Sequence, residues 1–574
     1  MVVGKLKLAN ADPFQALGQQ LNQAVKSQTK PAHLAPPDLK KAKAGLIDAP
    51  PSPIVTPKAK VTGVTKLPPP FKSFMKIDAF DVTIERPGAA AEVQRVSALR
   101  GKGDNCTMVV PVFLDEQGMP SFLLKDGNTR AAQEMRQPGS YRSKKGMVGG
   151  RWDKDVGADP AGIAKKIGIA ELAEEVGARA MKGGAFVLGE RLMATMPGQS
   201  TEADLPVVAL SAFVEGDKIT GDQSGMEVVG LMKPVLLSFE AAFAEARSGE
   251  ISEGPRFATY ARRSLDQFGF IPELKAYIFD LPPALKSAFK QNGTLGLGDP
   301  VDPRKIIATG EYESAEEIAH APDPNKAKPK VNPADINGVE FITTKRVEVE
   351  GFGTMFDALT DHVVKHDGKA DRADLTHPNQ ITHFDFDLAK VAVYYEDKVQ
   401  GPMVRLAEVE RPIFPAKGQD DEVAYKNEHY DLVRRDLPEV QVDLPFEGLK
   451  TPEEIIKKAS EIDIPKIAET AVKKAMDAGC EKATLAPLGA AGFASPGGAD
   501  LQHHFFAAKL SAPPASTEGF VRLSDAIRVM RGGEGDPAAE EGLLRLAAAT
   551  GWIPSLGMSI AMAKTHLSKF ADDE

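Results

Sequence analysis

Short runs rich in apolar residues predict strands at several places in the first half of the chain. They lie at 77–84 (IDAFDVTI), at 107–114 (TMVVPVFL) and at 121–124 (SFLL), and the last two flank a DEQGMP turn. Similar stretches recur at 185–194 and 204–213. Short apolar runs bounded by turn residues favour strands of a sheet.

Helical spacing predicts one helix between these strands and two helices after them. Apolar residues recur every three or four positions at 160–176, at about 238–248 and at 255–268. Asp159-Pro160 is a good helix start and Gly177 a good helix end. Strands and helices mixed in this order predict an α/β or α+β domain at 74–285.

The second half repeats landmarks of the first half in the same order. The stretch VVPVFLDEQGMPSFLL at 109–124 is similar to VAVYYEDKVQGPMVRL at 391–406. Later, GFIPEL at 269–274 is similar to GWIPSL at 551–556. A repeat of this length indicates duplicated domains rather than a solenoid. We therefore expect a linker at 286–337 and a second domain at 338–574.

Residues 1–73 differ in composition from the rest of the chain. They hold eleven lysines, three aspartates and no arginine or glutamate, which gives this segment a charge of +8. Ten prolines fall between residues 28 and 72. This composition predicts an extended Pro/Lys-rich tail, with a short helix after Asp12-Pro13. The tail is either a flexible extension or a tether that docks on a protein partner.

Overall composition excludes several classes of protein. The chain has 574 residues, 42% of them hydrophobic, and a net charge of −10, which argues against a dedicated nucleic-acid binder. There is no apolar run long enough to cross a membrane. Two cysteines, Cys106 and Cys480, favour a reducing compartment. We expect a cytoplasmic protein, or a component of an intracellular assembly or a virus particle.

Three glutamates share one face of the helix at 160–176. Glu171, Glu174 and Glu175 are spaced three and four residues apart, and they lie in the last turns, where the helix dipole disfavours anions. A hard divalent cation would reverse both penalties because it prefers carboxylate oxygens. The alternative is a solvated acidic face.

The surrounding residues resemble a known family motif. Gly149-Gly150 followed by AELAEEVGA at 170–178 resembles the Nudix box, Gly-x5-Glu-x7-Arg-Glu-U-x-Glu-Glu-x-Gly-U, where U is aliphatic. The MPGQSTE loop at 196–202 and the Met-Glu-Val at 226–228 resemble the ADP-ribose pyrophosphatase branch of the Nudix hydrolases. The resemblance implies two Nudix-type α/β/α sandwich domains with mixed sheets, one nearly intact and one degenerate.

The resemblance also implies roles for individual residues. Glu171 and Glu175 match the family's principal metal positions and Glu174 the remaining box glutamate, with Mg²⁺ or Mn²⁺ as the cofactor. Glu202 matches the loop carboxylate that activates the attacking water. Such an arrangement would neutralise a diphosphate and deliver the water against its negative charge.

Two positions depart from the box. Ala170 stands in place of the arginine, and Gly162 in place of the first glutamate. Six extra residues lie between Gly150 and Glu171 relative to the motif. The missing pair would normally brace the metal ligands.

A basic segment leads into Gly149-Gly150. Within 130–151 four arginines are candidates for binding the phosphates of a nucleoside diphosphate: Arg130, Arg136, Arg142 and Arg151. Guanidinium groups suit phosphate oxygens, so the segment is either a diphosphate clamp or an ordinary basic surface loop.

The second copy lacks the acidic cluster. Aligning Gly479 with Gly177 places Lys473, Met476 and Asp477 at the three glutamate positions, and Leu501, beside Asp500, at the position of Glu202. Lysine and methionine are poor ligands for a hard cation. This half therefore resembles a pseudo-enzyme domain that takes the place of a partner subunit.

Other histidine-rich patterns carry less information. His362 and His366 have helical spacing without the glutamate of a zinc-protease helix. His383, Asp385 and Asp387 would share one face of a strand, as a metal site or as an ordinary polar face. His503 and His504 would point to opposite faces of a strand.

Two functions from different classes follow from these patterns. The first is a magnesium-dependent pyrophosphohydrolase acting on ADP-ribose or a related nucleoside diphosphate derivative. The alternative is a non-catalytic structural or interaction protein built on duplicated Nudix folds. An acidic cluster faced by Glu202 would favour the enzyme, and a pocket filled by the tail or by the 150–162 insertion would favour the scaffold.

Overall fold

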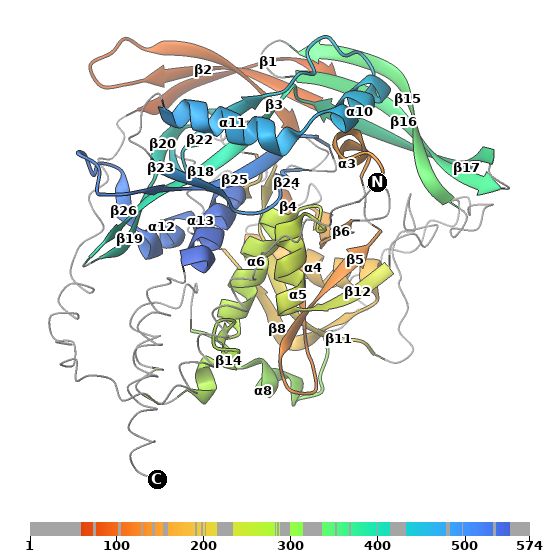
Figure 1. Ribbon diagram of the computed structural model, residues 1–574. Helices are drawn as coiled ribbons and strands as arrows, with labels where there is room; N and C mark the ends of the chain where they lie inside the picture. Colours follow the sequence, from red (N-terminus) through yellow and green to blue (C-terminus); the bar gives the residue numbers. More distant parts are fainter. Residues whose placement is uncertain are drawn as a thin grey trace, which may run out of the picture.

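A computed structural model describes most of the chain between residues 59 and 550 (Figure 1). The described residues are 59–72, 76–100, 105–127, 130–140, 144–152, 159–189, 192–196, 199–200, 202–214, 233–281, 283, 286, 299–313, 336–349, 353–366, 369–398, 400–413, 432–477, 483–495, 498–531 and 535–550. The expected helix after Asp12, residues 226–228, Cys480 and the GWIPSL repeat lie outside them.

The first half is built on a mixed sheet. Its path runs β12-β5-β4-β11-β8, in which β4 and β11 are parallel and the other neighbours antiparallel. Four short strands complete the sheet: β7 and β10 pair with β4, β6 pairs with β5, and β9 pairs with β10. Its strands are β4 (Asn105–Leu114), β5 (Pro120–Asp126), β6 (Lys145–Gly146), β7 (Val148–Arg151), β8 (Arg179–Val187), β9 (Met193–Ala194), β10 (Ala203–Asp204), β11 (Val207–Ala212) and β12 (Lys233–Ser238).

The second half contains a sheet of the same topology. Its path runs β23-β25-β18-β19-β26, with β18 and β25 as the parallel pair. Its strands are β18 (Phe386–Asp397), β19 (Gly401–Arg405), β22 (Glu439–Asp443), β23 (Ala483–Pro487), β24 (Gly492–Phe493), β25 (Gln502–Leu510) and β26 (Phe520–Arg522). Register also matches: Val109 pairs with Val207, and at the matching position of the repeat Val391 pairs with Phe506. The internal repeat read from the sequence is therefore present in the strand pairing.

Helices cover both faces of each sheet. In the first half α4 contacts one face, whereas α5 and α6 contact the other. In the second half α11 lies on one face and α12 and α13 on the other. These helices are α4 (Pro160–Val176), α5 (Phe239–Ser248), α6 (Gly254–Gln267), α11 (Ile464–Asp477), α12 (Leu523–Val529) and α13 (Pro537–Thr550). The predicted α/β class with mixed sheets is confirmed.

Each half is preceded by an antiparallel three-stranded sheet. The strands are β1 (Lys60–Lys72), β2 (Lys76–Glu85) and β3 (Glu92–Arg100) in the first sheet, and β15 (Ile336–Val349), β16 (Gly353–His366) and β17 (Lys369–His383) in the second. Strand β1 lies within 1–73, so the end of that segment is paired rather than a free tail. The register shifts between Leu67 and Phe71, which accommodates the three prolines that lack an N–H to donate.

These two sheets pack across the boundary between the halves. Phe80 and Val82 of β2 share a buried core with Leu432 and Val433 at β21 (Val433–Asp436), which pairs with β20 (Ala407–Glu410). Conversely, the sheet of the second half contacts the first half. Met135 of α3 (Ala131–Arg136) packs among residues of β15, β16, β17 and α10 (Pro452–Glu461). Each three-stranded sheet therefore contacts residues of the opposite half.

Helices α6 and α13 form a second contact between the halves, near the centre of Figure 1. Arg263 of α6 pairs with Glu540 of α13 at 2.6 Å. Arg263 also donates to the carbonyl of Leu188, and Arg545 of α13 donates to the carbonyl of Leu488 at the matching position. The Arg263–Glu540 pair and the bond from Arg545 to the carbonyl of Ala246 cross the boundary, so the two halves are in contact rather than forming separate lobes.

Part of the expected linker packs on the first half. Residues 299–313, which include α8 (Pro303–Ile307), run beside β8, and the backbone N–H of Glu313 donates to the carbonyl of Ala180. The small pair β13 (Phe270–Ile271) and β14 (Ala276–Tyr277), followed by the 3-10 turn η1 (Ile278–Asp280), precedes it. Among the described residues, no helix has the length and apolar character needed to cross a bilayer.

Candidate functional site

Helix α4 has the ends that its sequence predicts. The Asp159 side chain accepts a hydrogen bond from the backbone N–H of Gly162, and Pro160 occupies the first turn. Gly177 ends the helix with a left-handed φ of 65°, which a residue with a Cβ adopts less readily. Leu172 and Val176 face the sheet and are buried. The glutamates alternate with these anchors, so their positions are fixed by the packing of the helix.

Two of the three α4 glutamates reach the backbone of β7. Glu175 accepts a hydrogen bond from the N–H of Gly149 at 3.0 Å. Glu171 lies over Gly150, where a Cβ atom would come within 1.9 Å of its Oε1 atom. The Gly149-Gly150 pair therefore provides room for two carboxylates that the helix brings to one place.

This donor set suits a hard divalent cation. Glu171, Glu174 and Glu175 supply carboxylate oxygens from one helix, and the side chain of each is partly buried. A buried lysine already neutralises one of them: Lys125 Nζ of β5 lies 2.6 Å from Glu175 Oε1. The glutamates thus supply oxygen ligands beside Gly149-Gly150, and the ammonium group of Lys125 already contacts one of them.

Glu202 makes its contacts on the other face of the sheet. Its carboxylate lies 3.0 Å from the guanidinium of Arg256 on α6. The same guanidinium is 3.0 Å from Asp204 and 3.3 Å from Glu253, so one arginine joins three carboxylates. Helix α4 packs against the opposite face, through Thr107 and its neighbours. The structure therefore places Glu202 with α6 rather than with the α4 glutamates.

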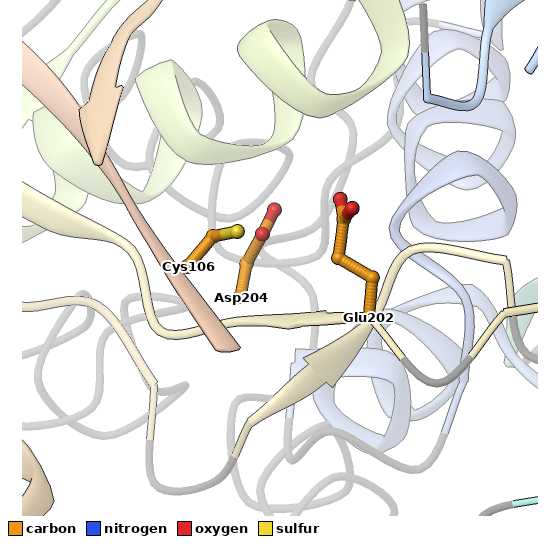
Figure 2. Close-up of side chains that lie close together, drawn as sticks. All are labelled: Cys106, Glu202 and Asp204. Atoms are coloured by element: carbon orange, nitrogen blue, oxygen red, sulfur yellow. The ribbon is translucent and has the colours of Figure 1, made fainter. Parts of the chain in front are cut away.

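Figure 2 shows Cys106, Glu202 and Asp204, which offer ligand atoms within 4.8 Å of one another. Burial raises the pKa of the Cys106 thiol well above its ordinary value, and Glu202 and Asp204 add to this. One observation argues against a metal ion here. The Arg256 guanidinium already compensates the carboxylates. We interpret this cluster as a buried arginine site.

Asp204 gives this cluster a pH dependence. Burial raises its pKa to about 7, against the opposing effect of Arg256. The folded state therefore binds a proton that the unfolded state releases at about 3.8, and the associated stability is lost as the pH rises from about 4 to 7. Asp204→Asn is expected to remove this loss. Between low and high pH, the free energy of unfolding of the wild type should fall by up to about 4 kcal/mol relative to that of the variant.

Urea unfolding of the wild type and Asp204→Asn at pH 5 and pH 8 measures the effect. The free energy of unfolding of the wild type should fall relative to that of the variant as the pH rises. Parallel pH profiles for the two proteins would contradict the assignment. Asp81→Asn, at an exposed ion pair with Arg95, serves as the control.

The described arginines among the four proposed to bind phosphate differ in their surroundings. Arg136 is fully buried, with Nη2 at 2.5 Å from Asp387 and Nη1 at 3.4 Å from Asp500, both in the second half. Its charge is thus committed to the contact between the halves. Arg130 and Arg151 are exposed, and Arg151 directly follows Gly150. Arg142 lies outside the described residues.

The second half has a lysine ion pair in place of the acidic cluster. Lys473 of α11 contacts Glu469 one turn earlier, and both are largely exposed. Met476 is partly buried, and the side chain of Asp477 lies outside the described residues. Leu501 is fully buried in the core near β24, where it cannot bind a cation. Among the residues of α11 whose side chains are described, none matches the glutamate set of α4.

The second half contains a buried ion cluster that the sequence did not indicate. Lys390 of β18 is fully buried between Asp436 at 3.1 Å, Glu439 at 2.7 Å and Asp536 at 3.3 Å. Asp436 and Glu439 lie close in sequence, but Lys390 and Asp536 are far from them along the chain, so no local motif marks the cluster. Burial raises the pKa of Asp436 to about 6, although Lys390 opposes the shift.

The second cluster involves His383, Asp387 and Arg136. His383 ends β17 and its Nδ1 lies 2.5 Å from Asp500, whereas Asp387 lies in β18 and contacts His504 at 3.0 Å. The sequence predicts that His383 and Asp387 share one face of a strand. Instead they lie on two different strands, β17 and β18. His362 and His366 fall in β16 rather than in a helix, and their side chains lie outside the described residues.

His503 and His504 point to opposite faces of β25, as the sequence predicts. His503 is fully buried on the α13 side, 4.0 Å from Asp536. His504 contacts Asp387 on the other side. Burial lowers the pKa of His503 to about 3, and Lys390 adds to this effect, so this ring stays neutral.

Comparison with known proteins gives little further information. No family model matches this sequence. No curated protein matches it either. A solved structure described as "Crystal structure of ADP compounds hydrolase" is similar over 37% of this chain and 97% of its own length, with 15% sequence identity and a TM-score of 0.25.

Proposed function

We propose that the first half of the chain is a magnesium-dependent pyrophosphohydrolase for a nucleoside diphosphate derivative, with ADP-ribose as the leading candidate. The observation that supports it is the convergence of Glu171 and Glu175 on Gly149-Gly150. Because the sequence around these glutamates resembles the Nudix box, we interpret their convergence as a metal site. In this proposal the second half supports the first.

Glu171 and Glu175 would hold the cation, which would polarise a diphosphate and the attacking water. Glu174 lies on the same helix face, so we assign to it the acceptance of the water proton. Arg256 holds Glu202 on the α6 side, and Glu202 is therefore not assigned this role. Arg151 follows Gly150 on β7 but pairs in register with Cys106, on the Glu202 side of the sheet, and it is therefore not assigned to the phosphates.

The test is a hydrolysis assay on ADP-ribose and a panel of nucleotide sugars, with Mg²⁺, Mn²⁺ or EDTA. Attack of water on one phosphorus breaks the phosphoanhydride bond, and two phosphomonoesters appear by ³¹P NMR. Turnover that EDTA abolishes is the expected result. A folded protein that cleaves no member of the panel with either metal would contradict the proposal.

A second function is favoured by a separate observation. Lys125 neutralises Glu175 and Arg256 neutralises Glu202, two carboxylates that the sequence assigned to the site, and neither ion pair requires a ligand. Such a site can serve as a folded scaffold alone. A non-catalytic interaction protein, with the N-terminal tail docking on a protein partner, is the function that an inactive first half would support.

A further inference from the structure

Lys125 occupies an unusual place for a lysine. It lies on β5, two residues after Leu123, whose side chain packs in the core beneath α4. The same strand face therefore brings the ammonium group to the acidic end of the helix. The side chains of Lys125 and Glu175 are only 3% and 8% exposed.

Both oxygens of Glu175 are engaged by the protein. Oε1 lies 2.6 Å from Lys125 Nζ, and Oε2 accepts from the backbone N–H of Gly149 at 3.0 Å. A divalent cation bound through either oxygen of Glu175 would lie close to the ammonium group, which contacts Oε1. Two positive charges at this separation repel strongly in a poorly hydrated site, because water screens them little.

Other lysines of the first half are not placed in this way. Lys145 on β6 pairs with Glu245 at 2.9 Å, but these side chains are 16% and 28% exposed and belong to a different pair of elements. Lys182 and Glu311 are mostly exposed. Among the described residues of the first half, the buried lysine–carboxylate ion pair thus includes Glu175, the proposed metal ligand.

We propose that Lys125 is a built-in competitor for the divalent cation, so that metal binding displaces its ammonium group from Glu175. This inference rests on the proposed metal site but not on turnover. Lys125 keeps Glu175 neutralised and in place while no metal is bound. The same contact weakens metal affinity, which makes occupancy sensitive to the free metal concentration.

Calorimetric titration with Mn²⁺, without substrate, tests the proposal on the full chain. Lys125→Met keeps the length of the side chain and removes its charge, and it is expected to tighten binding by about tenfold or more. Adding Glu175→Gln to this variant should abolish the gain. Lys145→Met is the matched control and should bind Mn²⁺ as the wild type does.

Thermal unfolding gives a second readout. Without its lysine partner Glu175 is left as a buried charge, so Lys125→Met should melt earlier than the wild type in EDTA. Mn²⁺ should then raise the melting temperature of this variant more than that of the wild type. A purely structural ion pair would lower the melting temperature without this metal-dependent recovery.

The wild type provides a test that does not depend on a variant folding. Amine-reactive labelling, read by peptide mass spectrometry, should modify Lys125 severalfold faster when Mn²⁺ is saturating. Equal labelling with and without saturating metal would overturn the proposal. So would equal Mn²⁺ affinity in the wild type and Lys125→Met, or no binding by a folded Lys125→Met.

These outcomes separate the inference from the proposed function. Tighter Mn²⁺ binding by Lys125→Met, with no hydrolysis by any variant, would support the competitor role and reject the hydrolase. Metal-dependent hydrolysis by the wild type, with unchanged Mn²⁺ affinity in Lys125→Met, would support the hydrolase and reject the competitor role.

Discussion

Glu175→Gln is expected to abolish magnesium-dependent hydrolysis by the first half, with a loss of about 100-fold or more in kcat/KM. The substitution replaces an anionic oxygen with an amide nitrogen that does not bind a hard cation. Shape and helix propensity change little, so the effect reports on charge. Glu171→Gln is expected to act in the same direction, because its carboxylate reaches the same pair of glycines.

The measurement is the initial rate on the best substrate of the panel, at several Mg²⁺ concentrations. Glu469→Gln is the matched control: it removes a helix carboxylate that pairs with an exposed lysine on the corresponding helix of the second half. This control should keep wild-type activity. Full activity in a folded Glu175→Gln protein would exclude α4 as the metal-binding helix.

Arg136→Met is expected to lower the free energy of unfolding by about 3–5 kcal/mol, because it leaves buried carboxylates without their cation. Burial raises the pKa of Asp387, but Arg136 and the hydrogen bond from His504 outweigh it, so that the pKa stays below its ordinary value. Asp387 is therefore ionised in the folded protein at neutral pH. Removal of the arginine leaves this charge and that of Asp500 in the contact between the halves.

Urea unfolding followed by intrinsic fluorescence and by far-UV circular dichroism measures this loss. The depressed pKa of Asp387 stabilises the fold above the unfolded value of 3.8, and that stability is lost as the pH falls further. Arg95→Met, at an exposed ion pair, should leave the urea midpoint nearly unchanged. An unchanged midpoint for Arg136→Met would show that this ion pair does not hold the halves together.

Local signals explain which elements the sequence predicted well. Helix α4 has the predicted limits because a capping aspartate, a proline in the first turn and a left-handed glycine mark its ends. Strands β2, β4 and β5 contain the predicted ranges, since short runs of apolar residues indicate strands that are buried in a sheet. The α/β class followed from these elements without knowledge of their packing.

Long-range contacts explain what the sequence did not reveal. Arg136 appears as one of several basic residues in a loop, and only its distant partners Asp387 and Asp500 give it a structural role. Lys125 gave no signal, because its partner Glu175 lies on another element. Strand β1 was overlooked because its prolines suggest an extended tail, whereas a register shift lets them join a sheet.

The crossed packing of the two three-stranded sheets affects how the chain folds as it is synthesised. Phe80 and Val82 on β2 find their apolar partners Leu432 and Val433 only after most of the chain has left the ribosome. Until then this face of an early sheet is exposed to water and to other nascent chains. Folding of the N-terminal strands is therefore completed late, and truncation after the first half would leave an aggregation-prone surface.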